Sequence, residues 1–492
     1  MLTRLRIDGF KNLVDVDLRF GPFTCLAGAN GVGKSNVFDA IVFLGSLADA
    51  TFVEAAAAVR ADGDDGGDML ELMFRSGDHV RDRMRFVCDL LVPRDAEDDL
   101  GQPAIATSTF LRYTLELGYV ADEMVQGGNR LSLLHEELVH INTSEARRDA
   151  LPFVDNKGGK WFESVFVQDR TGGPFISMTE DEEGRIVQLH QDGRSQDKKR
   201  RRGRQVPFRA DRLPRTVLSS VSASESPTAL VARREMRSWR RLQLEGSALR
   251  RSDRFDAPGT IATDGAHMPK TLRDLQMRSE RMKTPLTITD ELVARLSELV
   301  DDVRGLELDV DEARRRLTLV AQGSDGTRRP ARAMSDGTLR FLALAIIEQT
   351  RQSEVLCLEE PENGIHPSRI AAILRLLMDI AIDPDYPVDD DNPLRQVIVN
   401  THSPGFVRAC PKEALIVVDV VERVDVPSGR RAGTARFRAL PGTWRQALND
   451  RVQPVFMAEL LRFLESVPII ESSVPDDPVG DYVADQLMLA ID

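Results

Sequence analysis

The first fifty residues predict two short strands, a buried strand and a helix. Apolar and polar residues alternate over Leu2–Ile7 and again over Val14–Phe20, which is the pattern of half-buried strands. A continuous apolar run, PFTCLAG, then leads into a glycine-rich loop. A helix is expected over 34–47, because apolar residues recur there at helical spacing. They are Val37, Ala40, Ile41 and Leu44.

Residues 83–190 differ in character and predict an antiparallel sheet. Short runs of alternating apolar and polar residues follow one another there, divided by polar stretches rich in glycine and aspartate. The runs are RMRFVCDLLV, TFLRYTLELGYV, RLSLLHEELVHI and KWFESVFVQ.

The second half of the chain predicts helices and then a parallel sheet. Helices are expected over Ala229–Leu244 and over Asp290–Val303, the second with Thr289 as its N-cap. A hairpin, LELDVDEARRRLTLVAQ, precedes a long apolar helix in MSDGTLRFLALAIIEQT. Strand VLCLEE, helix SRIAAILRLLMDIAI and strand RQVIVNTHS follow, and such alternation is typical of a helix-flanked parallel sheet. Heptads are not sustained anywhere, so coiled-coil arms are not expected.

Composition favours a soluble globular protein. The chain has 492 residues, of which 42% are hydrophobic and 29% charged, enough to bury one large core or two ordinary ones. Its four cysteines are far apart and form no CxxC pair, so neither a disulfide framework nor a thiolate zinc site is expected. Apolar runs such as FLALAII are too short to cross a bilayer, and no apolar signal core follows Met1. We therefore expect a cytoplasmic protein with no membrane partner.

Charge is unevenly distributed along the chain. The net charge is −13, but residues 194–254 hold 18 Lys and Arg against 6 Asp and Glu, so the rest of the chain carries a net −25. This basic segment is a candidate nucleic-acid contact of the phosphate-backbone type, because its basic residues are not regularly interleaved with aromatic residues for base stacking. A solvated loop is the alternative. The candidate contacts are Lys198, Lys199, Arg200, Arg201, Arg202 and Arg204.

The glycine-rich loop at residues 28–35, GANGVGKS, matches G-x4-G-K-[ST] between a buried strand and a helix. Its glycines allow backbone N–H groups to face a phosphate, and the helix N-terminus adds partial positive charge. Lys34 is expected to reach the β- and γ-phosphates, and the Ser35 hydroxyl to hold Mg²⁺. The predicted nucleotide contacts are Gly28, Asn30, Gly31, Gly33, Lys34, Ser35 and Asn36.

Two carboxylates end the apolar strand VLCLEE. We expect Glu359 to orient the metal, directly or through a water, and Glu360 to polarise the attacking water. A strand that ends in two surface acids is the alternative, but the loop that contains Lys34 favours the catalytic interpretation.

Two further stretches stand at a defined distance from these carboxylates. Ser335 and Gly337 open a helix 25 residues before Glu360, and His402 closes a strand 42 residues beyond it. In isolation Ser335 is interpreted as an N-cap and His402 as an ordinary strand-end histidine. Their order and spacing favour a shared role in a nucleotide site.

In these four motifs the chain resembles the ABC-type ATPase heads of the SMC, RecF and OLD group. The resemblance rests on RIDGFKNL…LAGANGVGKSN, on MSDGTLRFLALA as the ABC signature, on VLCLEEPENGIHP as Walker B and D-loop, and on NTHSP as the switch histidine. It implies an α/β P-loop NTPase fold with an antiparallel β subdomain and a helical insertion. Two residues depart from the family pattern: Glu359 replaces an aspartate and Asp336 a glycine. The Q-loop glutamine cannot be placed from sequence.

The resemblance also implies a domain order, ligands and a dimer. We expect an N-terminal ATPase lobe at 1–195, a basic loop and helical insertion at 196–290, a C-terminal ATPase lobe at 291–450 and an acidic tail at 451–492. ATP and Mg²⁺ are the implied ligands, with Glu360 and His402 serving hydrolysis. Ser335 and Gly337 would clasp the nucleotide of a second head, so a homodimer is implied.

For biological role, the resemblance favours an ATP-driven switch in DNA-related phage defence or repair, acting with a separate effector such as a nuclease or toxin. The alternative is an ABC-type ATPase subunit of a protein machine or transporter that binds no nucleic acid. A nuclease in the same chain is not expected, because only 90 residues follow His402 and no TOPRIM-type carboxylate cluster is apparent there.

Overall fold

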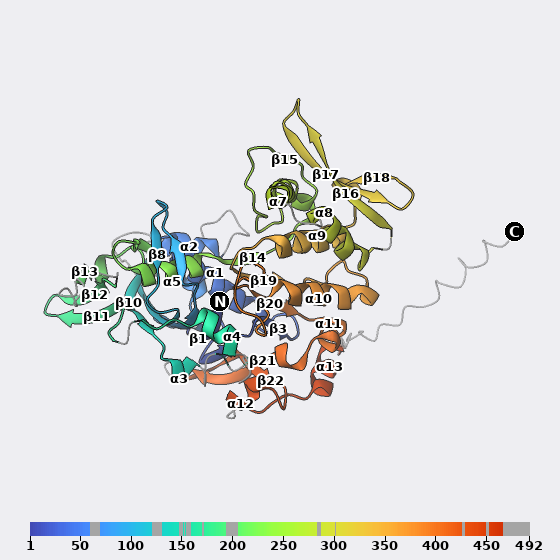
Figure 1. Cartoon of the computed structure of the whole chain (residues 1–492). Coiled ribbons are helices and arrows are strands. Elements are labelled where there is room, and N and C mark those ends of the chain that lie inside the picture. The colour runs from blue at the N-terminus through green and yellow to red at the C-terminus, as the bar shows by residue number, and fades with distance from the viewer. Residues whose placement is uncertain are drawn as a thin grey trace, which may run out of the picture.

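The computed structural model describes residues 1–59, 69–120, 130–146, 151, 153, 159–169, 172–192, 205–282, 287–300, 302–425, 429–448 and 452–465. The described chain forms two large sheets side by side and a third, smaller sheet that projects from one end (Figure 1).

The core sheet has six strands in the order β14-β19-β20-β3-β21-β22. Its first five strands are parallel, as the alternation of strands and helices predicted, and β22 is antiparallel to β21. The bounds are β14 Trp239–Leu242, β19 Val355–Glu359, β20 Gln396–Thr401, β3 Phe23–Ala27, β21 Leu415–Asp425 and β22 Arg430–Ala439.

The second sheet is the predicted antiparallel one, with eight strands in the order β13-β12-β11-β10-β9-β6-β1-β2. The two N-terminal strands complete it, since β1 pairs with both β2 and β6. The bounds are β13 Gln205–Arg209, β12 Gly184–His190, β11 Ile176–Asp181, β10 Arg130–His140, β9 Phe110–Val120, β6 Arg83–Leu91, β1 Leu2–Asp8 and β2 Val16–Arg19.

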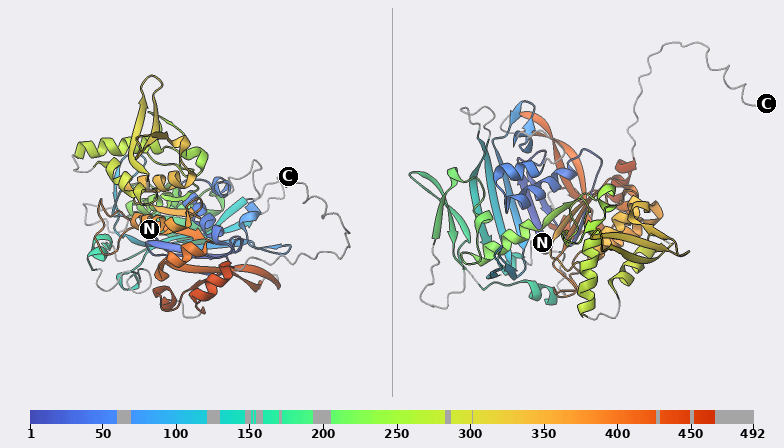
Figure 2. Two further views of the ribbon diagram at one scale, coloured as in Figure 1. Left: turned by 90° about the vertical axis from the view of Figure 1, so that its right-hand side faces the viewer. Right: turned by 90° about the horizontal axis from the view of Figure 1, so that it is seen from above.

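Helix α1 (Lys34–Leu47) joins the two sheets into one core. Its buried residues pack in one cluster with the antiparallel strands β1, β6 and β9 and with one face of the core sheet, at Cys357 and Ile398 among others. Figure 2 shows the helix between the sheets. The other face of the core sheet packs in a second cluster against α9 (Asp336–Gln349), α10 (Ile370–Ile380) and α11 (Pro404–Ala409). The helices α1 and α9 therefore cover opposite faces of the core sheet.

The projecting sheet has the order β15-β17-β16, with β18 paired to β17 (Figure 1). Its strands are β15 Asp253–Arg254, β17 Arg316–Gly323, β16 Val303–Asp311 and β18 Arg328–Pro330. The predicted hairpin is thus confirmed as β16 and β17. Helices α6 (Gly246–Leu249), α7 (Met268–Met282) and α8 (Ile288–Ser297) lie around it.

The remaining elements are short. They are the strands β4 Arg75–Ser76, β5 His79–Val80, β7 Asp95–Glu97 and β8 Pro103–Ile105, and the helices α2 Phe52–Ala58, α3 Thr143–Glu145, α4 Gly159–Val165, α5 Pro227–Arg237, α12 Trp444–Leu448 and α13 Met457–Glu465. Single 3₁₀ turns are η1 Met69–Leu72, η3 Ala210–Arg212, η4 Leu218–Ser220, η5 Ala331–Ala333, η6 Pro367–Arg369 and η7 Lys412–Ala414. Within the described chain no helix combines the length and the apolar character needed to cross a membrane.

Three predictions of local structure were wrong. The helix expected over 229–244 ends at Arg237, and residues 239–242 form the edge strand β14, paired in register with β19. The helix expected over 290–303 is α8, capped by Thr287 instead of Thr289, and Val303 already begins β16. The run KWFESVFVQ is not a strand: it contains α4, because Trp161, Phe162 and Val165 share one buried side at helical spacing.

Candidate functional site

The glycine-rich loop lies between β3 and α1, and its glycines are required by the backbone. Gly31 and Gly33 have φ values of 78° and 105°, and Gly33 is the N-cap of α1. A Cβ atom on Gly28 would stand 2.3 Å from the Val418 carbonyl oxygen, so no larger residue fits there. The Gly28 N–H donates to the Thr401 carbonyl (3.2 Å), which ties the start of the loop to the end of β20.

Lys34 is 6% exposed and its ammonium group lies inside this loop. It donates to the carbonyl oxygens of Gly28 (2.8 Å) and Ala29 (2.7 Å). Burial lowers the pKa of Lys34, and the negative charges of Glu360, Glu359 and Glu362 oppose that shift. A partly desolvated cation that faces carboxylates across the loop is suited to bind a phosphate.

Glu359 ends β19 and belongs to a chain of charged side chains. Its Oε1 lies 2.9 Å from an Arg241 guanidinium nitrogen, and Arg241 also bonds Asp39 of α1 (2.9 Å). Asp39 in turn accepts from Lys11 (2.5 Å). Although Glu359 Oε1 is close to Arg241, it is buried with no well-aligned hydrogen bond. With the exposed Ser35 hydroxyl it offers oxygen ligands of the type that Mg²⁺ prefers, so these residues fit the metal that the fold implies.

Glu360 has both carboxylate oxygens engaged. Its Oε1 lies 2.6 Å from His402 Nδ1, and its Oε2 accepts from Asn363 Nδ2 (2.7 Å). The Glu360 N–H donates to the carbonyl (3.0 Å) and to the side-chain oxygen (3.2 Å) of Asn400 on the neighbouring strand. The structure thus brings the strand-end histidine to the second carboxylate across 42 residues of sequence.

Glu362 is a third carboxylate that sequence analysis missed. It is 7% exposed, and its Oε1 accepts from the Thr401 hydroxyl. Thr401 Oγ1 also accepts from the Ser403 N–H (2.9 Å), so these bonds hold the turn that carries His402. Burial raises the pKa of Glu362, and the Thr401 hydrogen bond opposes this. The signal in the sequence was its position directly after the Glu-Glu-Pro of Walker B.

Ser335 is confirmed as an N-cap, with its side chain accepting from the Thr338 N–H of α9 (3.2 Å). Gly337 in the first turn of α9 is buried, and a Cβ there would stand 2.3 Å from the Gly364 carbonyl oxygen. Asp336, which replaces the usual glycine, forms an ion pair with Arg250. Ser335 therefore opens a helix that packs on the opposite face of the core sheet from α1, the helix that follows the glycine-rich loop.

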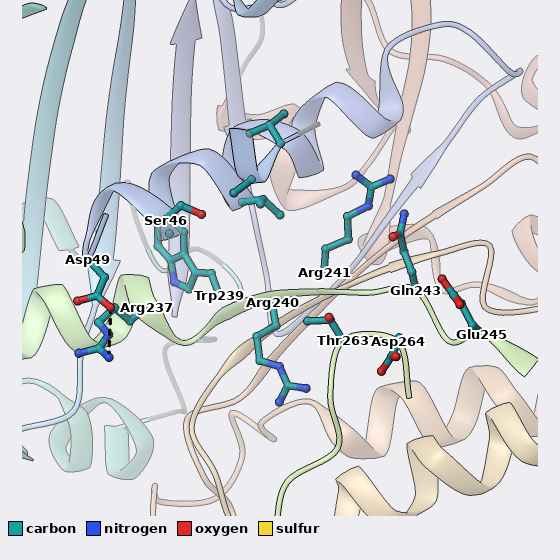
Figure 3. A pocket seen from close by; sticks show the side chains of 14 residues that line it. Ser46, Asp49, Arg237, Trp239, Arg240, Arg241, Gln243, Glu245, Thr263 and Asp264 are labelled. Atoms are coloured by element: carbon teal, nitrogen blue, oxygen red, sulfur yellow. Dashed lines mark ion pairs between the residues drawn. The ribbon is translucent and has the colours of Figure 1, made fainter. Parts of the chain in front are cut away.

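Gln243 is a second residue that sequence analysis missed, because the segment WRRLQ was interpreted as helix. It directly follows β14 and lines a cavity of about 470 Å³ together with Glu359, Glu360 and Asn363. It also lines a second cavity of about 660 Å³ between α1 and β14, where Arg241 and Gln243 lie side by side (Figure 3). The end of β14 thus brings a side-chain amide into the cavity that Glu359 and Glu360 line.

The basic segment cannot be assessed at its centre, because Lys198, Lys199, Arg200, Arg201, Arg202 and Arg204 lie outside the described residues. Of its described part, Arg209 forms ion pairs with Asp181 (2.7 Å) and Glu183 (2.6 Å). Arg209 is therefore largely neutralised within the antiparallel sheet.

A buried strand leads into a glycine-rich loop with a buried lysine, and the next strand but one in the sheet ends in carboxylates. These features define a mixed α/β P-loop NTPase. The family profile described as "AAA domain, putative AbiEii toxin, Type IV TA system" matches residues 23–78 and 163–408, and the chain belongs to this family. It is accordingly an ATP-binding ATPase of the P-loop class, for which ATP and Mg²⁺ are the general ligands.

Solved structures of SMC heads are similar to the chain at low identity. The "SmcHead bound to the C-winged helix domain of ScpA" is 14% identical, with 88% of this chain and 98% of that chain covered and a TM-score of 0.44. A Pyrococcus furiosus Smc head with an extended coiled coil, bound to the C-terminal domain of ScpA, is 12% identical. The match covers 89% of this chain and 96% of that chain, with a TM-score of 0.42. The Thermotoga maritima SMC head is also 12% identical. The match covers 89% of this chain and 98% of that chain, with a TM-score of 0.36. A search of curated proteins finds no match.

Proposed function

We propose that the protein hydrolyses ATP, and that binding of ATP drives the association of two heads. The observation that supports this most directly is the pair Glu360–His402 (2.6 Å) at the ends of β19 and β20, next to the strand that leads into the glycine-rich loop. A carboxylate positioned by a histidine beside a phosphate-binding loop can polarise a water for attack on the γ-phosphoryl group.

Each residue at this edge of the sheet has a distinct task in the proposed reaction. Lys34 exchanges its two loop carbonyls for phosphate oxygens, and the backbone N–H groups of residues 28–36 surround the triphosphate. Ser35 and Glu359 would hold Mg²⁺, which supplies neutralisation of the phosphate charge. Glu360 accepts the water proton, and His402 keeps its carboxylate oriented. Gln243 is placed to sense the occupied site, because it follows the strand next to β19.

The position of Ser335 supports the proposed dimer. Ser335 is exposed and opens α9, which packs on the opposite face of the core sheet from α1, the helix that follows the glycine-rich loop. A helix N-terminus with an exposed serine is suited to a phosphate. We propose that Ser335 and Gly337 contact the nucleotide held by the loop of a second copy.

Three variants test this division of labour. Lys34→Ala should abolish tight ATP binding, because the variant lacks the ammonium group that neutralises the phosphates. Glu360→Gln should bind ATP and lose turnover, by roughly a hundredfold or more. Ser335→Arg should bind ATP as a monomer and fail to associate. Sedimentation of the wild type and Glu360→Gln with and without ATP is the measurement, and an unchanged sedimentation coefficient contradicts the two-head arrangement.

For biological role we propose a cytoplasmic switch in DNA-related phage defence or repair that governs a separate effector. The family description, which names a toxin–antitoxin system, supports the defence branch. The alternative is a protein-machine subunit without nucleic-acid binding.

Replacing Lys198–Arg202 with serine separates these roles. If this segment contacts a phosphate backbone, the replacement should weaken DNA or RNA binding similarly for all sequences and flatten the salt dependence of the binding constant. ATP hydrolysis without nucleic acid should be unchanged. If the ATP-loaded Glu360→Gln protein binds neither DNA nor RNA at low salt, the alternative role is favoured.

A further inference from the structure

Glu360 has a backbone conformation that a glutamate does not favour, at the start of the turn that follows β19. Glu360 has a φ of 45°, in the left-handed region that residues other than glycine adopt only where the surroundings enforce it. Two bonds from its N–H to Asn400, and the turn closed by the Asn363 N–H on the Glu360 carbonyl (2.9 Å), enforce it here. Such conformations occur at switch segments, because a small change in the surroundings releases them.

Asn363 connects this strained turn to the reacting carboxylate. Its side-chain amide donates to Glu360 Oε2 (2.7 Å), while His402 already occupies Oε1. Both oxygens of the proposed base are therefore directed at protein groups. Each keeps one further lone pair, so the Asn363 bond does not block Oε2 but fixes the direction from which it can accept a proton from water.

Asn363 is in turn fixed from the side of α9. The Arg340 guanidinium donates to the Asn363 carbonyl (2.9 Å) and to the Leu244 carbonyl (3.1 Å), next to Gln243. One turn earlier on the helix, Gly337 packs against Gly364 so closely that a Cβ would overlap its carbonyl oxygen. Any displacement of the start of α9, where Ser335 lies, therefore moves the turn that holds Asn363.

We propose that Asn363 is a positioning residue that restrains Glu360 in the isolated head, and that movement of α9 on contact with a second head releases the restraint. The inference rests on the proposed function and adds a regulatory contact within one chain. The restraint on Glu360 makes hydrolysis slow until Ser335 has bound the partner's nucleotide. Arg340 and Gly337 transmit the position of α9 to Asn363.

The test compares Asn363→Ala in two backgrounds, the wild type and the Ser335→Arg monomer. In the monomer, kcat for ATP should rise roughly three- to tenfold, the range that one hydrogen bond corresponds to, with KM unchanged. In the wild type at dimer-forming concentration the change should be small, because the restraint is already released. The ratio of dimer to monomer kcat should therefore shrink.

Two further variants keep the test specific. Arg340→Lys keeps the positive charge but cannot bridge the two carbonyls, so it should shift the same ratio in the same direction. Asn392→Ala removes an asparagine whose side-chain hydrogen bonds, within the described part of the chain, stay inside the surface loop 383–392, so it should leave the ratio as in the wild type.

The outcomes separate the two proposals. If Asn363→Ala lowers kcat by the same factor in both backgrounds, or leaves the monomer unchanged, Asn363 does not restrain Glu360 and the inference is overturned. A wild type that hydrolyses no ATP, or that shows no ATP-dependent association, contradicts the proposed function instead.

Discussion

Glu136 of β10 is a carboxyl group in the interior of the molecule with no exposed surface. It accepts from the N–H groups of Val217 (2.8 Å) and Leu218 (2.9 Å) and from the Tyr113 hydroxyl (3.2 Å). Burial raises the pKa of Glu136 to about 7, and the three donors oppose this shift. The antiparallel sheet therefore contains a group that titrates near neutral pH.

The raised pKa predicts a pH-dependent stability. The folded state binds a proton more tightly than the unfolded chain, whose carboxyl titrates near 4.5. The free energy of unfolding should therefore decrease as pH rises from about 4.5 to about 7, by on the order of 3 kcal/mol from this group, and change little above. Urea unfolding of the wild type and Glu136→Gln at pH 5, 6, 7 and 8 measures this, and the variant should lose that part of the slope.

Glu137 supplies the control for this comparison, because it is the next residue on the same strand and is only partly buried. Glu137→Gln should keep the slope of the wild type. Equal slopes in all three proteins would show that Glu136 does not titrate over this range.

At the scale of elements, helix α8 shows how a local signal sets a boundary. Thr287 Oγ1 accepts from the Asp290 N–H (3.2 Å), and the Asp290 side chain accepts from the Thr287 N–H (3.3 Å), which is a reciprocal capping box. Leu292 and Leu296 on the buried side of α8 then pack in the cluster that contains α9. The cap therefore fixes where a helix under the projecting sheet begins.

Thr287→Ala should lower the free energy of unfolding by about 1 kcal/mol, because an N–H at the start of α8 loses its side-chain acceptor. Thr287→Ser keeps a capping hydroxyl and should recover most of this loss. Chemical denaturation of the three proteins is the measurement. A serine variant as unstable as the alanine variant would mean that the methyl group, and not the cap, is what α8 requires.

At the scale of the whole molecule, Gln396 of β20 connects the two large sheets. It has no exposed surface, and its side chain bonds both the N–H (2.9 Å) and the carbonyl (2.9 Å) of Leu2 on β1. It also donates to the Gly21 carbonyl (2.8 Å). One side chain of the core sheet thus satisfies backbone groups at the start of the antiparallel sheet and just before β3.

Gln396→Met should therefore destabilise the molecule by roughly 2–4 kcal/mol, because several buried backbone groups lose this partner at once. Since α1 also packs on both sheets, we expect one cooperative transition in the variant as in the wild type. Calorimetry measures both, and Gln188→Met on the more exposed strand β12 is the matched control. Two separate transitions in the wild type would contradict the view of the two sheets as one unit.

The sequence alone determined the features that depend on local backbone requirements. The glycines of residues 28–33, the capped helix at Ser335 and the hairpin β16–β17 were predicted, because positive φ angles, N-caps and strand alternation each have a signature within a few residues. The order of the four motifs also indicated a P-loop NTPase, which the family match confirms.

Only the tertiary structure decided features that depend on partners far away in the chain. Residues 239–242 have a composition compatible with a helix, but they form a strand because they pair with β19. That pairing brings Gln243 into the same cavity as Glu359. The contacts of Glu360 with Asn363 and with His402 likewise arise where the turn after β19 meets the end of β20. The reason is physical: hydrogen bonds and burial between distant segments outweigh local propensity, and no local pattern encodes them.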